Sequence, residues 1–332
     1  VRRRAVLSPV FVLRRLAGTV ALLFVLSVAV FALLQLAPGD PAHTLLGNRS
    51  ATPEALAAVR ARFHLDDPFA VQYAHWLGDA LRLDLGTSLR TGDEVAGAIG
   101  DRLALTGQLV GLGFAVAVLL GIPAGVLAGL RHRRPTDRAV QSLGVIALST
   151  PAFAGGLLLI YVFALLLGWF PAYGPGDGGA GDRLRHLVLP ALALGLSVTA
   201  VLLKLTRAAV VRELEREHVV FARARGVAPR TVLVRYVLRG TLVPVLTGAG
   251  LVVAYLLAGT VMVEQVFALP GLGSLLVDSV TFRDLPVVQA EALLVATVVC
   301  LANLAVDLAP PLLDPRLRTA PAATPAAEGE DR

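Results

Sequence analysis

Long apolar runs without charged residues set the strongest limit on how this chain folds. The clearest covers residues 16–36. A run of about 18 or more apolar residues is long enough to cross the hydrocarbon core of a bilayer as a helix. With 56% hydrophobic and 16% charged residues, the chain also has more apolar surface than a soluble core of this size would hide. The chain is therefore expected to be an integral membrane protein.

The same runs indicate helices as the spanning elements. Backbone groups in lipid must be hydrogen-bonded within the protein, so only helices and closed β-barrels cross membranes. Barrel strands would give segments of alternating polarity, and the sequence has none. The expected fold class is an all-α membrane protein with about six transmembrane helices. The predicted spans are residues 16–36, 103–130, 139–167, 187–203, 242–263 and 287–306.

Arginine placement predicts the orientation of these spans. Short connections rich in Arg and Lys stay in the cytoplasm. Basic residues gather at the N-terminus, in the turn at 131–134 and in the segment that follows the fourth span. The connections between them are acidic or rich in Gly and Pro. This alternation holds through all six spans, so both termini are predicted to be cytoplasmic.

The chain then divides into four parts. Residues 1–36 form an N-terminal segment and the first transmembrane helix, and residues 37–102 form an extracytoplasmic cap in which a helix is expected to begin at Pro53, after the cap residue Thr52. Residues 103–313 form a five-helix core with a cytoplasmic loop at 204–241. Residues 314–332, rich in Ala, Pro and acidic residues, are expected to be a disordered cytoplasmic tail.

Several function classes are disfavoured by charge and residue type. The net charge of +6 comes from arginines between apolar runs and not from one soluble basic face, so nucleic-acid binding is not expected. Cys300 is the only cysteine, and the six histidines show no ligand spacing. The only lysine, Lys204, precedes Leu205 and does not fit a phosphate-binding loop. No catalytic residue, cofactor or metal site is expected in this chain.

The cytoplasmic loop has the pattern of a helix, a sharp turn and a second helix. Acidic residues precede Arg223 and Arg225, an order that complements the helix dipole. Gly226 supplies the left-handed conformation at which helices end, and Pro229 suits the first turn of a new helix. Such a rigid element would transmit the movement of a partner to the bundle. From these residues alone, an amphipathic helix lying on the lipid surface is an equally good interpretation.

This loop resembles the cytoplasmic loop of binding-protein-dependent ABC importers. The version in the dipeptide/oligopeptide/nickel permease family reads acidic, aromatic, Val-Arg-Thr-Ala-Arg-Ala-Lys-Gly. The matching residues are Glu217, Val219, Ala222, Arg223, Ala224 and Gly226, with Arg225 matching in charge. His218 replaces the aromatic residue, and Val220 and Phe221 replace Arg and Thr.

Other short segments are similar to the family in the same order along the chain, up to about Arg318. They are Leu-Ala-Pro-Gly-Asp-Pro at 36–41, Leu-Asp-Asp-Pro at 65–68, Asp-Leu-Gly-Thr-Ser at 84–88, Leu-Val-Leu-Pro at 187–190, Glu-Gln-Val-Phe-Ala-Leu-Pro-Gly-Leu-Gly at 264–273 and Leu-Asp-Pro-Arg at 313–316. Each is weak alone, but their joint order is specific.

The resemblance implies a type I importer permease in the bacterial inner membrane. It implies pairing with a second homologous permease subunit, two ATPase subunits below and an extracytoplasmic substrate-binding protein that delivers cargo. ATP would be hydrolysed in the ATPase subunits. The cargo would be peptides, with nickel and other small solutes open. The ATPase-coupling residues it implies are Glu217, Ala222, Arg223, Ala224, Arg225 and Gly226.

Two other classes compete with this interpretation. A secondary transporter would have the same composition and helix count, but it would be expected to show paired broken helices and has no use for the loop at 204–241. A membrane hydrolase would need a nucleophile such as Ser274 with a suitably placed His and Asp, which the sequence does not offer.

Three features of the apolar segments are left as expectations. The segment 264–286 contains Pro270 and is favoured as a re-entrant outer gate over an ordinary surface loop. Glu291 either faces a cavity or a partner, or reaches the water at the outer surface, because a carboxylate in lipid is costly. Gly155 and Gly156 are expected to allow close helix packing.

Overall fold

The computed structural model describes residues 9–36, 52–62 and 65–313. Within these ranges the secondary structure is helical, and the only β-type pairing is an isolated bridge between Thr87 and Glu94. The predicted all-α fold class is therefore confirmed. The predicted tail at 314–332 and the first part of the predicted cap, residues 37–51, lie outside the described residues.

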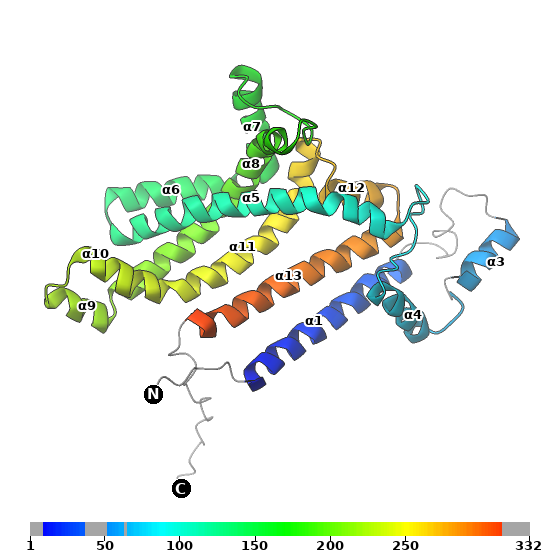
Figure 1. The fold of residues 1–332 in the computed structure, drawn as a ribbon, viewed down its shortest axis with the longest axis horizontal. Helices are drawn as coiled ribbons and strands as arrows, with labels where there is room; N and C mark the ends of the chain where they lie inside the picture. Colours follow the sequence, from blue (N-terminus) through cyan, green and yellow to red (C-terminus); the bar gives the residue numbers. More distant parts are fainter. Residues whose placement is uncertain (1–8, 37–51, 63–64, 314–332) are drawn as a thin grey trace, which may run out of the picture.

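Five helical segments are long and apolar enough to cross a membrane, and they run side by side along the length of the molecule (Figure 1). They are α1 (Pro9–Leu36), α5 (Val95–Leu130), α8 (Ala180–Leu214), the continuous segment of α10 (Pro229–Thr231), η2 (Val232–Val237) and α11 (Leu238–Val266), and α13 (Leu285–Leu313). The shorter elements are α3 (Pro53–Arg62), α4 (Phe69–Leu81), α6 (Pro135–Ser149), α7 (Ala152–Leu159), the π-helical η1 (Ile160–Leu166), α9 (Glu217–Ala224) and α12 (Leu272–Thr281). Most spans extend beyond their predicted ends, because polar turns continue the helices past the apolar runs.

The third predicted span, residues 139–167, is wrong as a single helix. The chain bends by 99° between α6 and the unit formed by α7 and η1. Thr150 is extended there, with φ −90° and ψ 114°, because the following Pro151 disfavours a helical backbone at the residue before it. Counted as one broken span, this pair brings the number of spans within the described residues to six.

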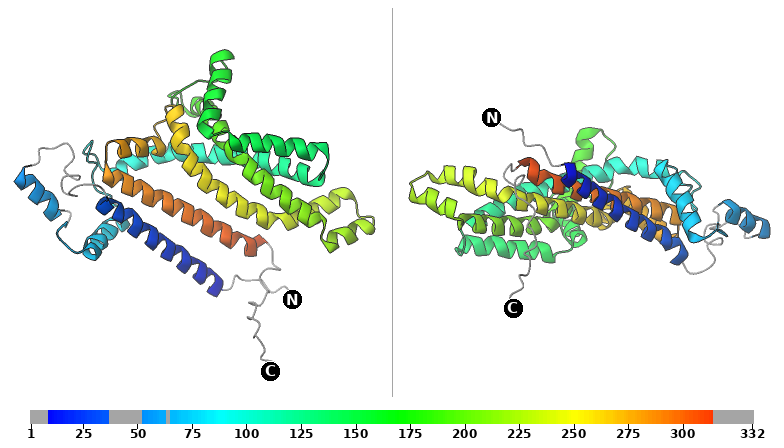
Figure 2. Two further views of the ribbon diagram at one scale, coloured as in Figure 1. Left: turned by 180° about the vertical axis from the view of Figure 1, so that it is seen from behind. Right: turned by 90° about the horizontal axis from the view of Figure 1, so that it is seen from below.

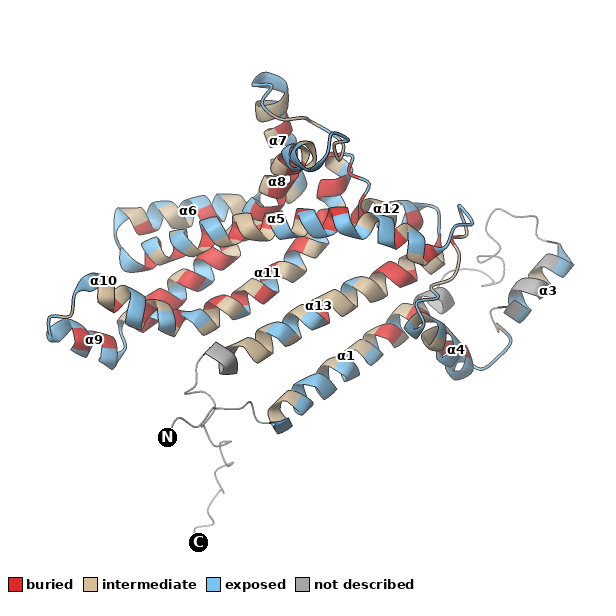
Figure 3. Cartoon of the chain, viewed as in Figure 1, coloured by how far each residue is buried: buried red, intermediate tan, exposed pale blue. Residues whose placement is uncertain are grey.

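Helix α8 is the centre of the bundle. Buried residues concentrate on α8 where it meets α5 and α11, whereas α1 and α13 are coloured mainly as exposed or intermediate (Figure 3). In the most apolar 18-residue stretch of each helix, 61% of the stretch is buried in α8 but only 6% in α13. The outer helices have apolar surfaces because lipid is their solvent.

A stripe of small residues lets α5 lie directly against α8. Every fourth residue of α5 is small and buried, and the stripe comprises Gly113, Ala117, Gly121, Gly125 and Gly129. A Cβ atom at Gly125 would lie 2.7 Å from both the carbonyl oxygen of Leu203 and the Cβ of Thr206. Small residues at this spacing allow helix backbones in a membrane to approach closely. The same reasoning holds for Gly156, where a Cβ would lie 2.9 Å from the Phe267 ring, but Gly155 has more space.

The basic segments all gather at one end of the bundle. The start of α1, the end of α13, the turn between α5 and α6, and α9 lie toward one end, and α3, α4 and α12 lie toward the other (Figures 1 and 2). This arrangement agrees with the predicted alternation of basic and non-basic connections. The end that carries α9 is therefore the cytoplasmic end.

At the opposite end, α4 packs against α1. The hydroxyl groups of Tyr73 and Ser27 are 2.7 Å apart, and the Phe31 ring makes edge contacts with Phe69 and Tyr73 at centroid distances of 5.3 and 5.7 Å. The predicted helix start at Pro53 is confirmed by α3. The aromatic contacts fix the position of α4 on the first span.

We expect Gly125→Leu to destabilise the purified protein by about 1–3 kcal/mol, because the added side chain overlaps the α8 backbone. The matched control is Gly111→Leu on the same helix, where a Cβ would have no atom within 4 Å apart from the nearby backbone of its own helix. Each variant is heated in detergent, and size-exclusion chromatography then measures the fraction that stays folded, which gives the Tm. An equal Tm for the two would contradict the proposed role of the stripe.

Candidate functional site

Helix α9 lies at the cytoplasmic end, at the tip of the hairpin formed by α8 and the α10–α11 segment (Figure 2). Arg216 has an extended backbone before α9, and Gly226 has φ +75° after it. Helix α10 then begins at Pro229. The predicted helix–turn–helix, its left-handed glycine and its initial proline are all present.

The inner face of α9 is anchored by apolar packing. Val219 is fully buried and Ala222 is 6% exposed. Val219 packs in a cluster with Val210 of α8 and with Val232 and Val237 of η2. Ala222, one of the predicted coupling residues, therefore lies on the face of α9 that packs against the bundle and not on its exposed face.

Glu213, near the end of α8, joins three elements through one carboxylate. The side chain is almost fully buried, and its oxygens lie 3.1 Å from Nε of Arg216 and 3.2 Å from Nε2 of His218. On its other side the carboxylate packs against Gly240, where any Cβ would overlap it. Glu213 thus connects the end of α8, the start of α9 and the start of α11.

In the sequence, Glu213 was only one of the acidic residues that precede Arg223, and its contacts were not predicted. The available signal is an acidic residue in the last turn of a long helix, followed by basic residues three and five positions later. The glycine that makes room for it comes far along the chain, so the contact is not visible in the local pattern. His218, which replaces the family's aromatic residue, still makes a ring contact, with its centroid 6.2 Å from that of Tyr236.

The outer face of α9 combines charge with exposed apolar side chains. Five of the predicted coupling residues are exposed, namely Glu217, Arg223, Ala224, Arg225 and Gly226. Phe221 is 64% exposed and Val220 is 53% exposed. The Arg225 guanidinium lies 5.7 Å from the centroid of the Phe221 ring. Aromatic and arginine side chains together are typical of surfaces that bind another protein.

A buried ion pair fixes the turn between α5 and α6 to α8. Arg207 binds both oxygens of Asp137, with Nε–Oδ1 at 2.6 Å and Nη2–Oδ2 at 2.8 Å. Asp137 also accepts hydrogen bonds from the backbone N–H of Arg133 and the amide of Gln141, each at 3.0 Å. Two-point arginine–carboxylate pairs are geometrically specific. The cytoplasmic ends of α5, α6 and α8 are therefore linked.

At the outer end, Glu264 joins α5, α11 and α12. The fully buried carboxylate accepts hydrogen bonds from Oγ1 of Thr106 at 2.6 Å and from the backbone N–H of Ser274 at 3.0 Å. The backbone N–H of Leu272 donates to the same threonine hydroxyl at 2.9 Å. The segment 264–286 is thus a packed element containing α12 and not an ordinary surface loop. The Ser274 hydroxyl donates to the Gly271 carbonyl at 2.8 Å.

Glu291 does not reach the outer surface. Its side chain is 2% exposed, and neither carboxylate oxygen has a hydrogen-bond partner within the described part of the chain. It lines a cavity of about 490 Å³ together with Thr106 and Thr260. Of the two expectations for this residue, the one in which it extends to water is wrong, and the one in which it faces a cavity holds.

Comparison with known proteins agrees with this architecture. The family model described as "Binding-protein-dependent transport system inner membrane component" matches residues 121–319, and a model for the N-terminal part of such membrane components matches residues 9–110. The glutathione transport system permease protein GsiC of Escherichia coli (strain K12) is 39% identical over 308 residues, covering 93% of this chain and 98% of that protein. The probable peptide ABC transporter permease protein y4tP of Sinorhizobium fredii is 37% identical over 311 residues, covering 93% and 99%.

A solved structure shares the fold. A chain from the inward-facing MetNI methionine ABC transporter has a TM-score of 0.54 and 17% identity, and the similarity covers 67% of this chain and 97% of that one. The family match spans well over half of the chain, and relatives near 40% identity span almost all of it. This chain therefore belongs to the inner membrane components of binding-protein-dependent transport systems, as the multi-pass permease subunit of an ABC importer.

Proposed function

We propose that this permease imports short peptides and is driven by a separate ATPase subunit that docks on α9. The observation that carries the proposal is the two-sided nature of α9. Its outer face has an exposed Phe221 and charged neighbours, whereas its inner face is fixed by Val219 and Glu213. A helix built in this way is suited to bind a moving partner and to pass the movement on.

The route of the movement follows from the contacts of Glu213. A force on α9 reaches the ends of α8 and α11 together, because Glu213 bridges to α9 and packs against Gly240. Since α8 is the central helix, its displacement shifts the bundle as a body. Rigid-body movement of packed helices is the general basis of alternating access.

The proposed assembly has the composition that the resemblance implies. This chain would pair with a second homologous permease subunit, with two ATPase subunits below and a substrate-binding protein above. ATP would be hydrolysed in the ATPase subunits, because the single lysine does not form a phosphate-binding loop. The extracytoplasmic cap, residues 37–102, would meet the binding protein, and the segment around α12 would act as the outer gate.

The peptide cargo is proposed from the relatives. The Escherichia coli relative is named for glutathione transport and the Sinorhizobium fredii relative for peptide transport. The similarity to each relative covers 93% of this chain. Glutathione and other short peptides are therefore the first substrates to test.

The complete transporter, reconstituted in vesicles with its ATPase and binding-protein partners, should take up a radiolabelled short peptide only when ATP is present on the ATPase side. The chain alone should neither bind ATP nor take up the peptide along an imposed proton or sodium gradient. Gradient-driven uptake by the isolated chain would overturn the proposal in favour of secondary transport. Uptake of a nickel chelate, with no uptake of the peptide, would overturn the assignment of cargo.

Gly226→Val should reduce ATP-dependent uptake by about tenfold or more, because a β-branched residue resists the positive φ of the turn after α9. The matched control is Gly226→Asn, since asparagine tolerates this conformation. Immunoblotting of membranes should show equal amounts of both variants. Normal uptake by the valine variant would refute the role of the turn.

A further inference from the structure

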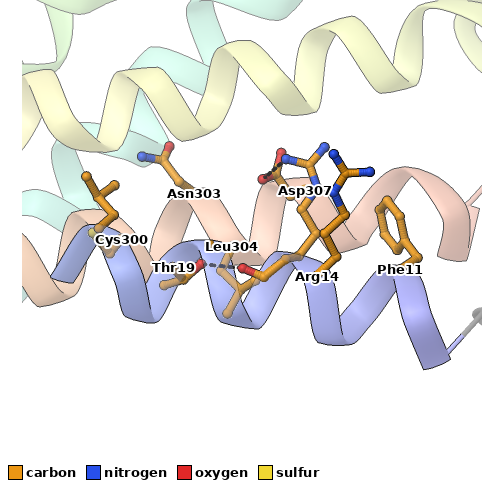
Figure 4. A pocket seen from close by; sticks show the side chains of 10 residues that line it. Phe11, Arg14, Thr19, Cys300, Asn303, Leu304 and Asp307 are labelled. Atoms are coloured by element: carbon orange, nitrogen blue, oxygen red, sulfur yellow. Dashed lines mark hydrogen bonds and ion pairs between the residues drawn. The ribbon is translucent and has the colours of Figure 1, made fainter. Parts of the chain in front are cut away.

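A polar cluster between α1 and α13 has no part in the proposed transport mechanism. It lines a cavity of about 530 Å³ at the cytoplasmic end of the bundle (Figure 4). The cavity has polar side chains from both helices, Arg14, Arg15 and Thr19 from α1 and Asn303 and Asp307 from α13. Volumes of this size are typical of pockets that bind small molecules. We call it the α1–α13 pocket.

Among the described residues that line it, the pocket has one positive charge in excess. Arg15 pairs with Asp307, with Nη1 and Oδ2 2.8 Å apart, and its guanidinium lies 5.6 Å from the centroid of the Phe11 ring. Arg14 forms no ion pair with any described residue, and it projects in the same direction as Asp307 (Figure 4). Two guanidinium groups and one carboxylate leave a net charge of +1. A group with a single negative charge would neutralise the pocket.

The pocket lies at the depth of the inner headgroups. Helix α1 has 28 residues and is therefore about 42 Å long, which exceeds the roughly 30 Å of a hydrocarbon core. Arg14 is about 8 Å from the start of the helix at Pro9. The uncharged apolar run begins at residue 16, directly after Arg15. The guanidinium of Arg14 therefore falls at the boundary between the headgroups and the acyl chains.

An apolar cavity continues the pocket toward the outer leaflet. This second cavity, of about 490 Å³, shares Leu22, Cys300 and Asn303 with the α1–α13 pocket. Beyond these residues its walls are mainly apolar, with Leu26 of α1 and Val299 of α13, although Glu291 and Thr260 line the same cavity. A charged lower end that leads into an apolar channel matches the two ends of a phospholipid.

We propose that the α1–α13 pocket binds an anionic glycerophospholipid of the inner leaflet. Its phosphodiester would pair with Arg14, and one acyl chain would occupy the apolar channel between α1 and α13. A phosphodiester carries one negative charge and complements the excess of the pocket, whereas a zwitterionic headgroup adds an ammonium that Arg14 repels. Basic pockets between transmembrane helices on the cytoplasmic side bind anionic headgroups in this way. The lipid would fill the space between the two most exposed spans.

Native mass spectrometry of the full chain in detergent measures lipid retention directly. With phosphatidylglycerol or phosphatidylethanolamine added, the unmodified chain should retain the anionic lipid preferentially. Arg14→Gln should reduce its retention by about fivefold, whereas Asp307→Asn should raise it by a similar factor, because Arg15 is freed. The matched control is Arg138→Gln, an exposed cytoplasmic arginine of α6 that does not line the pocket.

Three outcomes would overturn the proposal. The first is equal retention of the two lipids by the unmodified chain. The second is equal retention of phosphatidylglycerol by Arg14→Gln and Arg138→Gln. The third is displacement of the bound lipid by inorganic phosphate at millimolar concentration, which would make the pocket a site for free anions. The opposite effects expected for Arg14→Gln and Asp307→Asn separate loss of binding from a general loss of folding.

Discussion

The close contact between α5 and α8 is the constraint on which the rest of the structure depends. Because lipid tails are as apolar as leucine, spanning helices gain little from burying apolar side chains and associate through close packing. The stripe from Gly113 to Gly129 brings the backbone of α5 within contact of α8. Helices α7 and α11 then pack on α8, and α8 becomes the element whose displacement all of them share.

Buried acidic side chains then fix the two ends of this core. At the cytoplasmic end, Asp137 holds the α5–α6 turn to Arg207 of α8, and Glu213 holds α9 and α11 to the end of α8. At the outer end, Glu264 holds α12 to α5 and α11. Buried carboxylates are costly unless they are paired, so each one specifies a single arrangement of the helices around it. The part of the bundle between these two ends is therefore suited to move as one rigid body.

Patterns along the sequence were sufficient for the outline of the fold. Apolar runs and arginine placement predicted the spans and their orientation, and Gly226 and Pro229 predicted the turn after α9, because these signals are local. The break at Thr150 was also locally encoded by Pro151, but the apolar run on both sides of it concealed the bend. The continuous apolar character of that segment indicates contact with lipid, but it does not show where the helix bends.

The contacts that define the candidate site were largely beyond sequence reasoning. Glu213 meets Gly240, and Glu264 meets Thr106, across long separations in the chain, and a single sequence gives no signal for such pairs. The exposure of Phe221 also contradicts what its residue type suggests, since phenylalanine is usually buried. Ala222 matched the family pattern, yet its place on the packed face of α9 became clear only from the three-dimensional contacts.

The central claim is that α9 is the docking point of an ATPase subunit, and thiol cross-linking tests it most directly. The chain has one cysteine, Cys300, which is buried, so an introduced cysteine is the accessible one. In the assembled transporter, Phe221→Cys should cross-link to the ATPase subunit through a short bifunctional reagent. Leu81→Cys should not, although Leu81, at the outer end of the molecule, is even more exposed than Phe221. An intact transporter in which Phe221→Cys gives no cross-link to the ATPase subunit would contradict the account.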